Sequence, residues 1–331
     1  MNRVIKFSEY GDAHVLNIEQ MDSTELAIGK GQVRVKMQAV ALNRSDSLFR
    51  QGQYIFDATF PSRICVEGVG SIEAMADDVE GFSIGQRVGL LAPADISGSG
   101  YAADFAVVDN NLLLPIPENM DVRHAATTWI PFLTVYHLFV EQHRAKEGNW
   151  IVLPAASSSV ALAANNVARH LGAQTIALTR TSRKKEELLA AGYSEVIVSE
   201  DEDVTARIKE ITGGGADFIF DPVGGPQLKE LVAAVNPGAD INIYGVLSSE
   251  NTVLPIFEMM QSGARLSSYS VYELLQDPVR LKQAINFYLP LFESGKLLPV
   301  VDTTEFTLDS IVDAFKHLES NTQLGKVVLT V

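Results

Sequence analysis

The sequence has few of the residues that support several common kinds of site. Its 331 residues include one cysteine, Cys65, which excludes an intramolecular disulfide and a zinc site built from a cysteine cluster. No apolar run reaches the roughly 18 residues that a membrane-spanning helix needs, and the first residues contain no apolar signal-peptide segment. Lysine and arginine number 26 against 41 aspartates and glutamates, and the net charge of −15 disfavours nucleic acids and anionic membranes as partners. We therefore expect a cytoplasmic protein that binds neither a nucleic acid nor a membrane.

The two parts of the chain differ in their hydrophobic pattern. At this length two domains are favoured over one. The first 125 residues indicate a β-rich domain, because apolar and polar residues alternate over 33–39 and further short strands are expected at 85–91 and 101–108. A helix is expected over 125–141. From there strands and helices alternate, which predicts a parallel sheet with helices on both faces.

The alternating elements can be placed by residue number. Strands are predicted at 150–154, 175–179, 195–198, 217–221 and 240–245, with a sixth at 266–271. Helices are predicted at 158–171, 182–191, 203–212 and 226–235. The C-terminal part predicts a helix at 277–294, a strand at 297–301, a helix at 308–319 and a strand at 326–331.

Residues 150–180 are the most informative segment. They form an apolar strand, a turn of small residues, an Ala-rich helix and a second apolar strand. Such a unit places backbone N–H groups and the positive end of a helix beneath a pyrophosphate. The second strand ends in Thr179 and Arg180 rather than in an acidic residue, and a basic residue suits the 2′-phosphate of NADP. The segment therefore predicts an NADP-binding protein.

The turn in this segment departs from the glycine pattern Gly-x-Gly-x-x-Gly. Ser157, Ser158, Ser159 and Ala161 occupy the stretch where glycine lets a phosphate approach the backbone. Serine is small and its hydroxyl can donate to a phosphate. An ordinary β-α-β turn that binds nothing remains the alternative.

Short motifs occur along almost the whole chain in a fixed order. They are ALNRSD at 41–46, GQY at 52–54, EGVG at 67–70, FSIGQRV at 82–88, LTVY at 133–136, the turn at 155–161, DPVGG at 221–225, YGVLS at 244–248 and GKVVL at 325–329. In this order and spacing they resemble the medium-chain dehydrogenase/reductase superfamily, in its zinc-free quinone oxidoreductase branch.

The resemblance implies an α/β protein with two domains. Residues 1–127 and 268–331 would form a GroES-like, β-rich catalytic domain, and residues 128–267 a doubly wound Rossmann domain that binds NADP. Family members carry the active site in the cleft between the two domains. They usually assemble as homodimers or homotetramers, and we expect a homodimer.

The resemblance also shows where this chain departs from its zinc-dependent relatives. Those relatives carry a cysteine near residues 43–46, a Gly-His-Glu where this chain has Cys65-Val66-Glu67, and a third ligand near residues 131–132. Asp46 and Glu67 remain here, but two carboxylates without cysteine or histidine make a poor zinc site. The sequence therefore predicts catalysis without a metal.

The β-α-β unit and the resemblance together assign roles along the cofactor. The adenosine end is expected at Thr179, Arg180, Arg183 and Lys184. The pyrophosphate is expected over Ser157, Ser158, Ser159 and Val160, with Lys326 reaching it from the C-terminal strand. The ribose and carboxamide are expected beside Val223, Tyr244, Gly245 and Leu247. Core packing is the alternative for Val223 and Tyr244, and a solvated helix start is the alternative for Arg183 and Lys184.

The reaction implied by the resemblance is hydride transfer from NADPH to a quinone or an α,β-unsaturated carbonyl. Asn43 and Thr134 would lie near the nicotinamide, and Tyr54 is the candidate proton donor, or simply a wall of the pocket. The alternatives are a zinc-free carbonyl or alcohol oxidoreductase and a catalytically idle relative that binds nucleotide or a partner. The pocket loops expected at 51–61 and 248–260 do not reveal which substrate is used.

Overall fold

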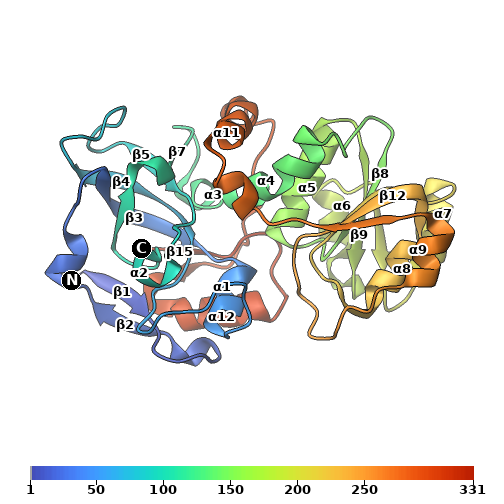
Figure 1. Ribbon diagram of the computed structural model, residues 1–331, viewed down its shortest axis with the longest axis horizontal. Coiled ribbons are helices and arrows are strands. Elements are labelled where there is room, and N and C mark those ends of the chain that lie inside the picture. The colour runs from blue at the N-terminus through green and yellow to red at the C-terminus, as the bar shows by residue number, and fades with distance from the viewer. Residues whose placement is uncertain (1) are drawn as a thin grey trace. The chain divides into compact units, whose positions relative to one another are not determined.

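The structure is a computed structural model that describes residues 2–331, apart from the side chain of Ser23 (Figure 1). The chain forms two compact units. Unit 1 comprises Met1–Ile130 with Leu289–Val331, and unit 2 comprises Pro131–Tyr288. The boundaries expected after residues 127 and 267 differ from these, most at the second crossing, which falls inside helix α11 (Pro278–Glu293).

Unit 1 is built on a seven-stranded, mainly antiparallel sheet. The strands follow the order β14-β15-β3-β4-β5-β7, and β6 pairs with β3. Their bounds are β3 (Gln32–Ala41), β4 (Glu67–Met75), β5 (Arg87–Leu90), β6 (Phe105–Asp109), β7 (Leu113–Pro115), β14 (Phe306–Thr307) and β15 (Val328–Thr330). In β3 the alternation predicted from the sequence holds, because Val33 and Val35 are fully buried while Lys36 is exposed.

The remaining elements of unit 1 are short. A separate two-stranded sheet pairs β1 (Arg3–Lys6) with β2 (Asn17–Gln20). The α-helices wholly within the unit are α1 (Arg44–Arg50), α2 (Ile96–Ser99), α3 (Val122–Ala125) and α12 (Ile311–Glu319). Helix α12 is amphipathic, since Ile311, Ala314, Phe315 and Leu318 are buried at helical spacing.

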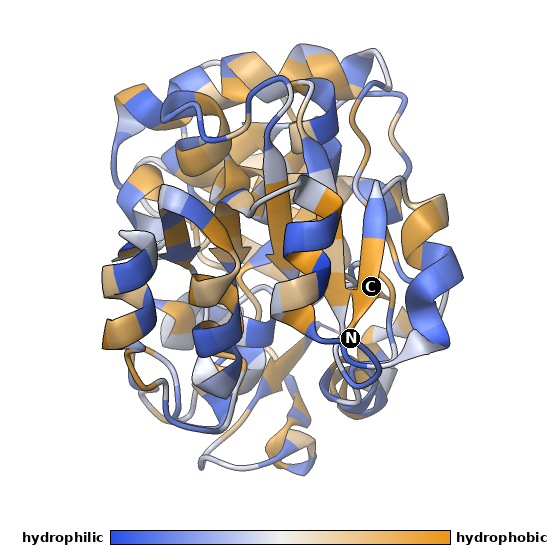
Figure 2. Cartoon of the chain, turned by 90° about the vertical axis from the view of Figure 1, so that its right-hand side faces the viewer, coloured by the Kyte–Doolittle hydropathy of each residue, from blue (hydrophilic) through white to orange (hydrophobic). Residues whose placement is uncertain are grey.

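Unit 2 contains a six-stranded sheet in which every pair is parallel, as predicted. The order β10-β9-β8-β11-β12-β13 is that of a doubly wound fold. The strands are β8 (Trp150–Pro154), β9 (Gln174–Thr179), β10 (Glu195–Val198), β11 (Ala216–Asp221), β12 (Val235–Ile243) and β13 (Arg265–Ser268). Figure 2 shows that these strands are largely hydrophobic, whereas the helices around them carry hydrophilic residues as well. This pattern is expected when helices cover both faces of a parallel sheet.

Helices connect the strands of unit 2. They are α4 (Trp129–Tyr136), α5 (Ser159–His170), α6 (Lys185–Ala190), α7 (Val204–Thr212), α8 (Leu228–Ala233), α9 (Ile256–Ser262) and α10 (Tyr272–Leu275), of which α4 begins two residues before the boundary of the unit. Helix α9 was not predicted and lies inside the expected pocket loop 248–260. It ends at Gly263, whose φ of 64° is typical of a helix C-terminus.

Two predicted elements are wrong. The expected helix over 125–141 is divided into α3, α4 and a π-helical segment, η4 (His137–Glu141). Pro131 lies in the first turn of α4, where proline is tolerated, and it cannot sit inside a continuous helix without breaking it. The expected strand at 297–301 forms only an isolated bridge between Val301 and Lys326. Pro299 has no N–H to donate to a ladder.

Candidate functional site

In unit 2 the turn after β8 leads into a helix start with the backbone geometry that suits an anion. Ala155 adopts a φ of 48°, the left-handed region that glycine usually fills in such turns. Ser158 is the N-cap of α5, and its Oγ accepts a hydrogen bond from the amide of Ala161 at 3.2 Å. The amides of Ser159 and Val160 lie in the first turn, where no helical carbonyl stands four residues earlier to accept their hydrogen bonds, so they remain available to a ligand. These groups and the positive end of the helix favour a phosphate.

The alanine in place of the last glycine does not line the surface of this turn. Ala161 is only 1% exposed, so its methyl group packs in the interior. The helix start therefore keeps its polar groups at the surface without the usual glycine.

The strand order places this turn at the switch point of the sheet. β8 lies between β9 and β11, and the connections run in opposite directions from there. Parallel strands end at one edge, so the loops after β11 and β12 flank the same edge as the turn. Ligands of doubly wound proteins bind at this position.

The loops after β11 and β12 hold one another by backbone hydrogen bonds. The Asp221 carboxylate accepts from the amides of Val223 and Gly224, at 2.7 and 3.1 Å. The amide of Leu247 donates to the carbonyl of Pro222 at 3.0 Å. A Cβ on Gly245 would lie 2.9 Å from that same carbonyl oxygen, which explains the glycine. The predicted residues Val223, Tyr244, Gly245 and Leu247 thus lie in two adjoining loops.

The ring of Tyr244 stacks on Phe220 with a centroid separation of 3.9 Å. Burial raises the pKa of its phenol above the ordinary value, so the phenol stays protonated at neutral pH. The core-packing alternative therefore describes the ring of Tyr244, which packs in the interior, whereas its backbone belongs to the loop at the end of the strand.

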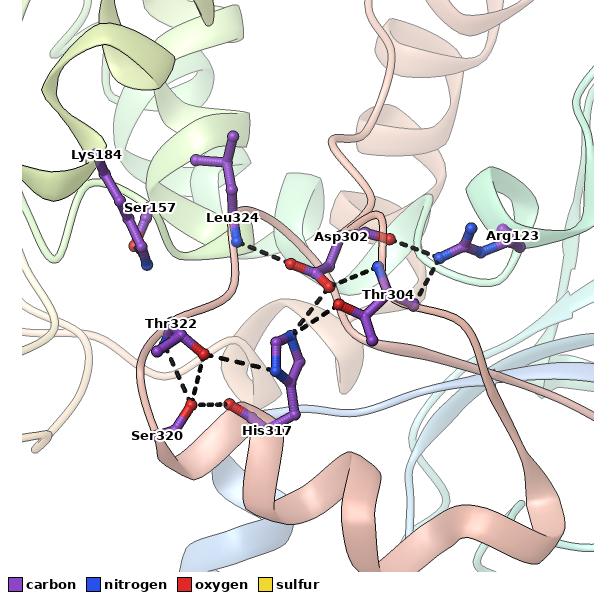
Figure 3. Close-up of polar contacts among 9 residues, drawn as sticks. All are labelled: Arg123, Ser157, Lys184, Asp302, Thr304, His317, Ser320, Thr322 and Leu324. Carbon is purple, nitrogen blue, oxygen red and sulfur yellow. Dashed lines mark hydrogen bonds and ion pairs between the residues drawn. The ribbon is translucent and has the colours of Figure 1, made fainter.

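The segment after β9 carries three cationic side chains. Arg180 and Arg183 are exposed and have no ion-pair partner within residues 2–331, and Thr179 is half-buried. Lys184 is only 8% exposed, and its Nζ donates to the Oγ of Ser157 at 2.9 Å (Figure 3). Lys184 therefore does not belong to a solvated helix face. It joins the end of β9 to the turn after β8.

In unit 1 three buried ionisable residues, Asp46, Glu67 and Lys326, lie with the half-buried amide of Asn43, and we call these four residues the Lys326 cluster. The ammonium of Lys326 lies 2.6 Å from Glu67 Oε2 and 2.5 Å from Asn43 Oδ1. Glu67 Oε1 accepts from the amide of Ile130 at 2.8 Å, and Asp46 Oδ2 accepts from the amide of Asn43 at 2.7 Å. Lys326, Glu67 and Asp46 are 1 to 2% exposed, whereas Asn43 is half-buried.

The charges in this cluster are perturbed by burial. Burial raises the pKa of Asp46 to about 7; Glu67 adds to the rise, and the amide of Asn43 and the ammonium of Lys326 oppose it. Burial also raises the pKa of the neighbouring Cys65 thiol well above its ordinary value. The thiol therefore stays protonated and is a poor metal ligand.

The cluster does not fit a zinc ion. Zinc sites in proteins use cysteine, histidine and carboxylate ligands in sets of three or four. Within residues 2–331 no group of three or more histidine, cysteine, aspartate or glutamate residues is placed to hold a metal ion. Glu67 Oε2 is already bound by the ammonium of Lys326, which a metal cation would have to displace. No step of a reaction at this site can therefore be derived from zinc.

The other predicted side chains lie apart in the chain. Thr134 belongs to α4 and is 7% exposed. Tyr54 follows α1, is half-buried, and meets Phe56 edge to face at 5.8 Å. Asn43 and Tyr54 belong to unit 1 and Thr134 belongs to unit 2, so their common role stays a prediction.

Sequence reasoning missed two pairings. It placed Lys326 at the pyrophosphate, whereas the structure shows its ammonium on Glu67 and Asn43. It also missed the hydrogen bond between Lys184 and Ser157. The motifs contain Asn43, Glu67, Ser157 and Lys326, and the segment after the second strand contains Lys184, but no local pattern indicates a contact between residues 67 and 326.

Two family models match the chain. One, described as alcohol dehydrogenase GroES-like domain, matches residues 29–118, and the other, described as zinc-binding dehydrogenase, matches residues 159–289. No helix among the described residues is long and apolar enough to cross a membrane.

Several known proteins are similar to the chain. A phenolphthiocerol/phthiocerol polyketide synthase polypeptide of Mycobacterium tuberculosis is 30% identical over 308 residues, which cover 91% of this chain but only 14% of that protein. The quinone oxidoreductase of Rattus norvegicus is 26% identical over 99% of this chain and 97% of its own length. The Escherichia coli quinone oxidoreductase, solved in complex with NADPH, is 24% identical, with a TM-score of 0.90 and full coverage of both chains. These matches confirm the predicted fold, a GroES-like β-rich part joined to a Rossmann-type parallel sheet.

Proposed function

Because the chain belongs to the medium-chain dehydrogenase/reductase superfamily, in its quinone oxidoreductase-like branch, we propose that it is an NADPH-dependent oxidoreductase that reduces a quinone or an α,β-unsaturated carbonyl. When bound, NADPH would supply the hydride. The acceptor would take up this hydride and a proton, and NADPH would leave as NADP⁺. Two relatives carry the name quinone oxidoreductase, which supports this substrate class.

The observation that carries the proposal is the placement of Lys184. It holds a nearly buried ammonium against the serine turn, beside two exposed arginines without ion-pair partners among residues 2–331. Three cations and no acid at the end of β9 suit a 2′-phosphate rather than a free ribose hydroxyl. We assign Thr179, Arg180, Arg183 and Lys184 to this phosphate, and the amides of Ser159 and Val160 to the pyrophosphate.

The protein's own contribution to the reaction is orientation and charge. Val223, Gly245 and Leu247 would border the nicotinamide end, since their loops are fixed to one another at the strand ends. Asn43 and Thr134 would hold the nicotinamide and the acceptor in a reactive orientation. Tyr54 would give a proton to the reduced acceptor, directly or through water.

We propose that the reaction proceeds without zinc. In this chain the fixed charge beside Asn43 is the Lys326 ammonium, paired with Glu67. A quinone or enone needs only stabilisation of a developing oxyanion, which hydrogen-bond donors can provide. Oxidation of a simple alcohol, by contrast, relies in zinc enzymes on the metal as a Lewis acid.

We also propose that the protein is a homodimer that forms through the β13 edge of unit 2. β13 ends the sheet. Exposed apolar side chains gather on the nearby segment 246–260, namely Val246, Leu247, Val253, Leu254, Ile256, Phe257 and Met260. Phe257 alone is 81% exposed. Such a patch marks an interaction surface, and an unpaired strand edge can pair with its own copy about a two-fold axis.

The proposal is tested by titrating the purified protein with NADPH and with NADH and following nicotinamide fluorescence. We expect NADPH to bind more tightly, and Arg180→Ala to weaken NADPH binding about 10- to 100-fold with little effect on NADH, because a charge-assisted contact is lost. Lys209→Ala, which removes an exposed lysine from α7, is the matched control. Equal affinities for both cofactors would place the 2′-phosphate site elsewhere. Absence of binding would favour the idle relative.

A further inference from the structure

The side-chain amide of Asn43 lies between two groups of opposite charge. Its Oδ1 faces the Lys326 ammonium at 2.5 Å, and its Nδ2 faces Glu67 Oε2 at 3.5 Å. An ammonium can only donate hydrogen bonds and a carboxylate can only accept them. The amide therefore has one orientation, with its oxygen toward Lys326 and its N–H groups on the other side.

Lys326 is held firmly by the backbone around it. Its amide donates to the carbonyl of Val300, and its carbonyl accepts from the amide of Asp302, both at 2.9 Å. Gly325 precedes it with a φ of 88°, and a Cβ there would lie 2.3 Å from the Val300 oxygen. This close approach requires glycine.

The segment before Lys326 is anchored as well. The Asp302 carboxylate accepts from the amide of Leu324 and pairs with Nε2 of His317, each at 3.0 Å (Figure 3). It also accepts from the amide of Thr304 at 2.9 Å. Asp302 thus fixes the chain from which the lysine extends.

Glu67 completes the arrangement and is itself fixed. One of its oxygens accepts from the amide of Ile130, and the other bonds the ammonium of Lys326. Lys326 and Glu67 are 1 and 2% exposed, whereas Asn43 is half-buried. Asn43 is therefore the member of the Lys326 cluster that a ligand can reach.

From this geometry we infer that Lys326 is a positioning residue, which acts on the reaction by holding the amide of Asn43 in one orientation, and is not a contact to the cofactor pyrophosphate. The inference rests on the proposed function, which places Asn43 beside the nicotinamide and the hydride acceptor. A small displacement of an orienting group lowers the reaction rate rather than the binding affinity, because the reacting atoms must be aligned.

The orientation of the amide can be tested without any cofactor. The full-length protein is labelled with ¹⁵N-asparagine, and Asn43→Asp identifies the two Nδ2 proton signals of Asn43. We expect Lys326→Met to shift and broaden these signals, since the amide then loses the ammonium that fixes its oxygen. Lys316→Met, an exposed lysine on α12, is the matched control and should leave them unchanged. Unchanged Asn43 signals in a folded Lys326→Met protein would overturn the inference.

Kinetics then separates positioning from cofactor binding. We expect Lys326→Met to lower kcat about 10- to 100-fold while the NADPH Kd stays near that of the wild type. In an Asn43→Ala background the same substitution should change kcat by less than about twofold, because its effect passes through the amide. A raised, salt-dependent NADPH Kd with normal kcat would show a pyrophosphate contact instead and overturn the inference, as would additive effects of the two substitutions.

Two further measurements keep the test decisive. Lys326→Met leaves Glu67 and Asp46 buried without their cation, which is strongly destabilising. If that variant does not fold, Lys326→Met with Glu67→Gln removes both charges of the pair and undergoes the same measurements. Wild-type protein that neither binds NADPH nor turns over would refute the proposed function, whereas wild-type turnover with an unaffected Lys326→Met enzyme would refute only the role of Lys326.

Discussion

Asp46 makes the stability of unit 1 depend on pH in an unusual direction. Burial raises its pKa from the ordinary 3.8 to about 7 in the folded protein. This rise in pKa means that the folded protein disfavours the ionised carboxylate over the neutral acid by about 4 kcal/mol more than the unfolded chain does. Between these two pKa values the folded protein holds a proton that the unfolded chain has released, so stability falls as pH rises and the loss is complete above the folded pKa.

Asp46→Asn tests this reasoning, because asparagine resembles the neutral acid and can still accept from the amide of Asn43. Relative to wild type, the variant should gain about 3 kcal/mol in unfolding free energy between about pH 5 and pH 8. Urea unfolding followed by tryptophan fluorescence measures the difference. In a Trp150→Phe background the remaining tryptophan, Trp129, is buried in unit 1 and reports on it.

Asp104 is the matched control, because its shift has the opposite sign. Burial works to raise the pKa of Asp104, but hydrogen bonds from Arg3 hold it below the ordinary value. Asp104→Asn should therefore destabilise unit 1 at neutral pH, and the difference from wild type should shrink as pH falls through the folded pKa. An Asp46→Asn difference that is constant with pH, or that grows toward acid, would refute the account of the buried cluster.

Two other predictions concern unit 2. Ser158→Ala removes the N-cap of α5 and should lower the free energy of unfolding by about 1 kcal/mol, measured by urea unfolding followed by Trp150 fluorescence. Ser158→Asn introduces another good N-cap and should retain most of this free energy. Equal losses of stability in the two variants would contradict the capping role. Phe257→Asp places a charge among the exposed apolar side chains of segment 246–260 and should yield a monomer, measured by light scattering after gel filtration. The control Lys209→Ala should remain a dimer. If the Phe257→Asp variant has the same mass as the wild type, this face is not the interface.

The Rossmann-type half was predictable because its signals are local. Strands such as β8 and β9 are short apolar runs, and two of the predicted helices begin at a residue that caps them. Ser158 and Asp203 do so for α5 and α7. The parallel order then follows from the alternation of the elements. The strand expected at 297–301 failed for the opposite reason, since its apolar pattern gave no information on whether a neighbouring strand would pair with it.

The site was predictable only in part. Residues at strand ends, such as Thr179 and Val223, could be placed because parallel strands end at one edge. The Lys326 cluster could not, because Lys326 meets Glu67 and Asn43 across more than half the chain. Lys184 shows the same limit at shorter range. The sequence predicted that Lys184 meets the cofactor, with a solvated helix start as the alternative, and only the fold brings its ammonium to Ser157.

The most direct test of the central claim is isotope transfer. The purified protein would be incubated with NADPH in which deuterium replaces both hydrogens at the nicotinamide C4 position and with either a quinone or an α,β-unsaturated ketone, and the products analysed by mass spectrometry. For the enone we predict one deuterium on the β-carbon of the reduced product, and for both acceptors we predict one equivalent of NADP⁺ per molecule reduced, without loss of rate after treatment with a zinc chelator. Unlabelled enone product, activity abolished by the chelator, or no turnover of either acceptor by protein that binds NADPH would contradict it.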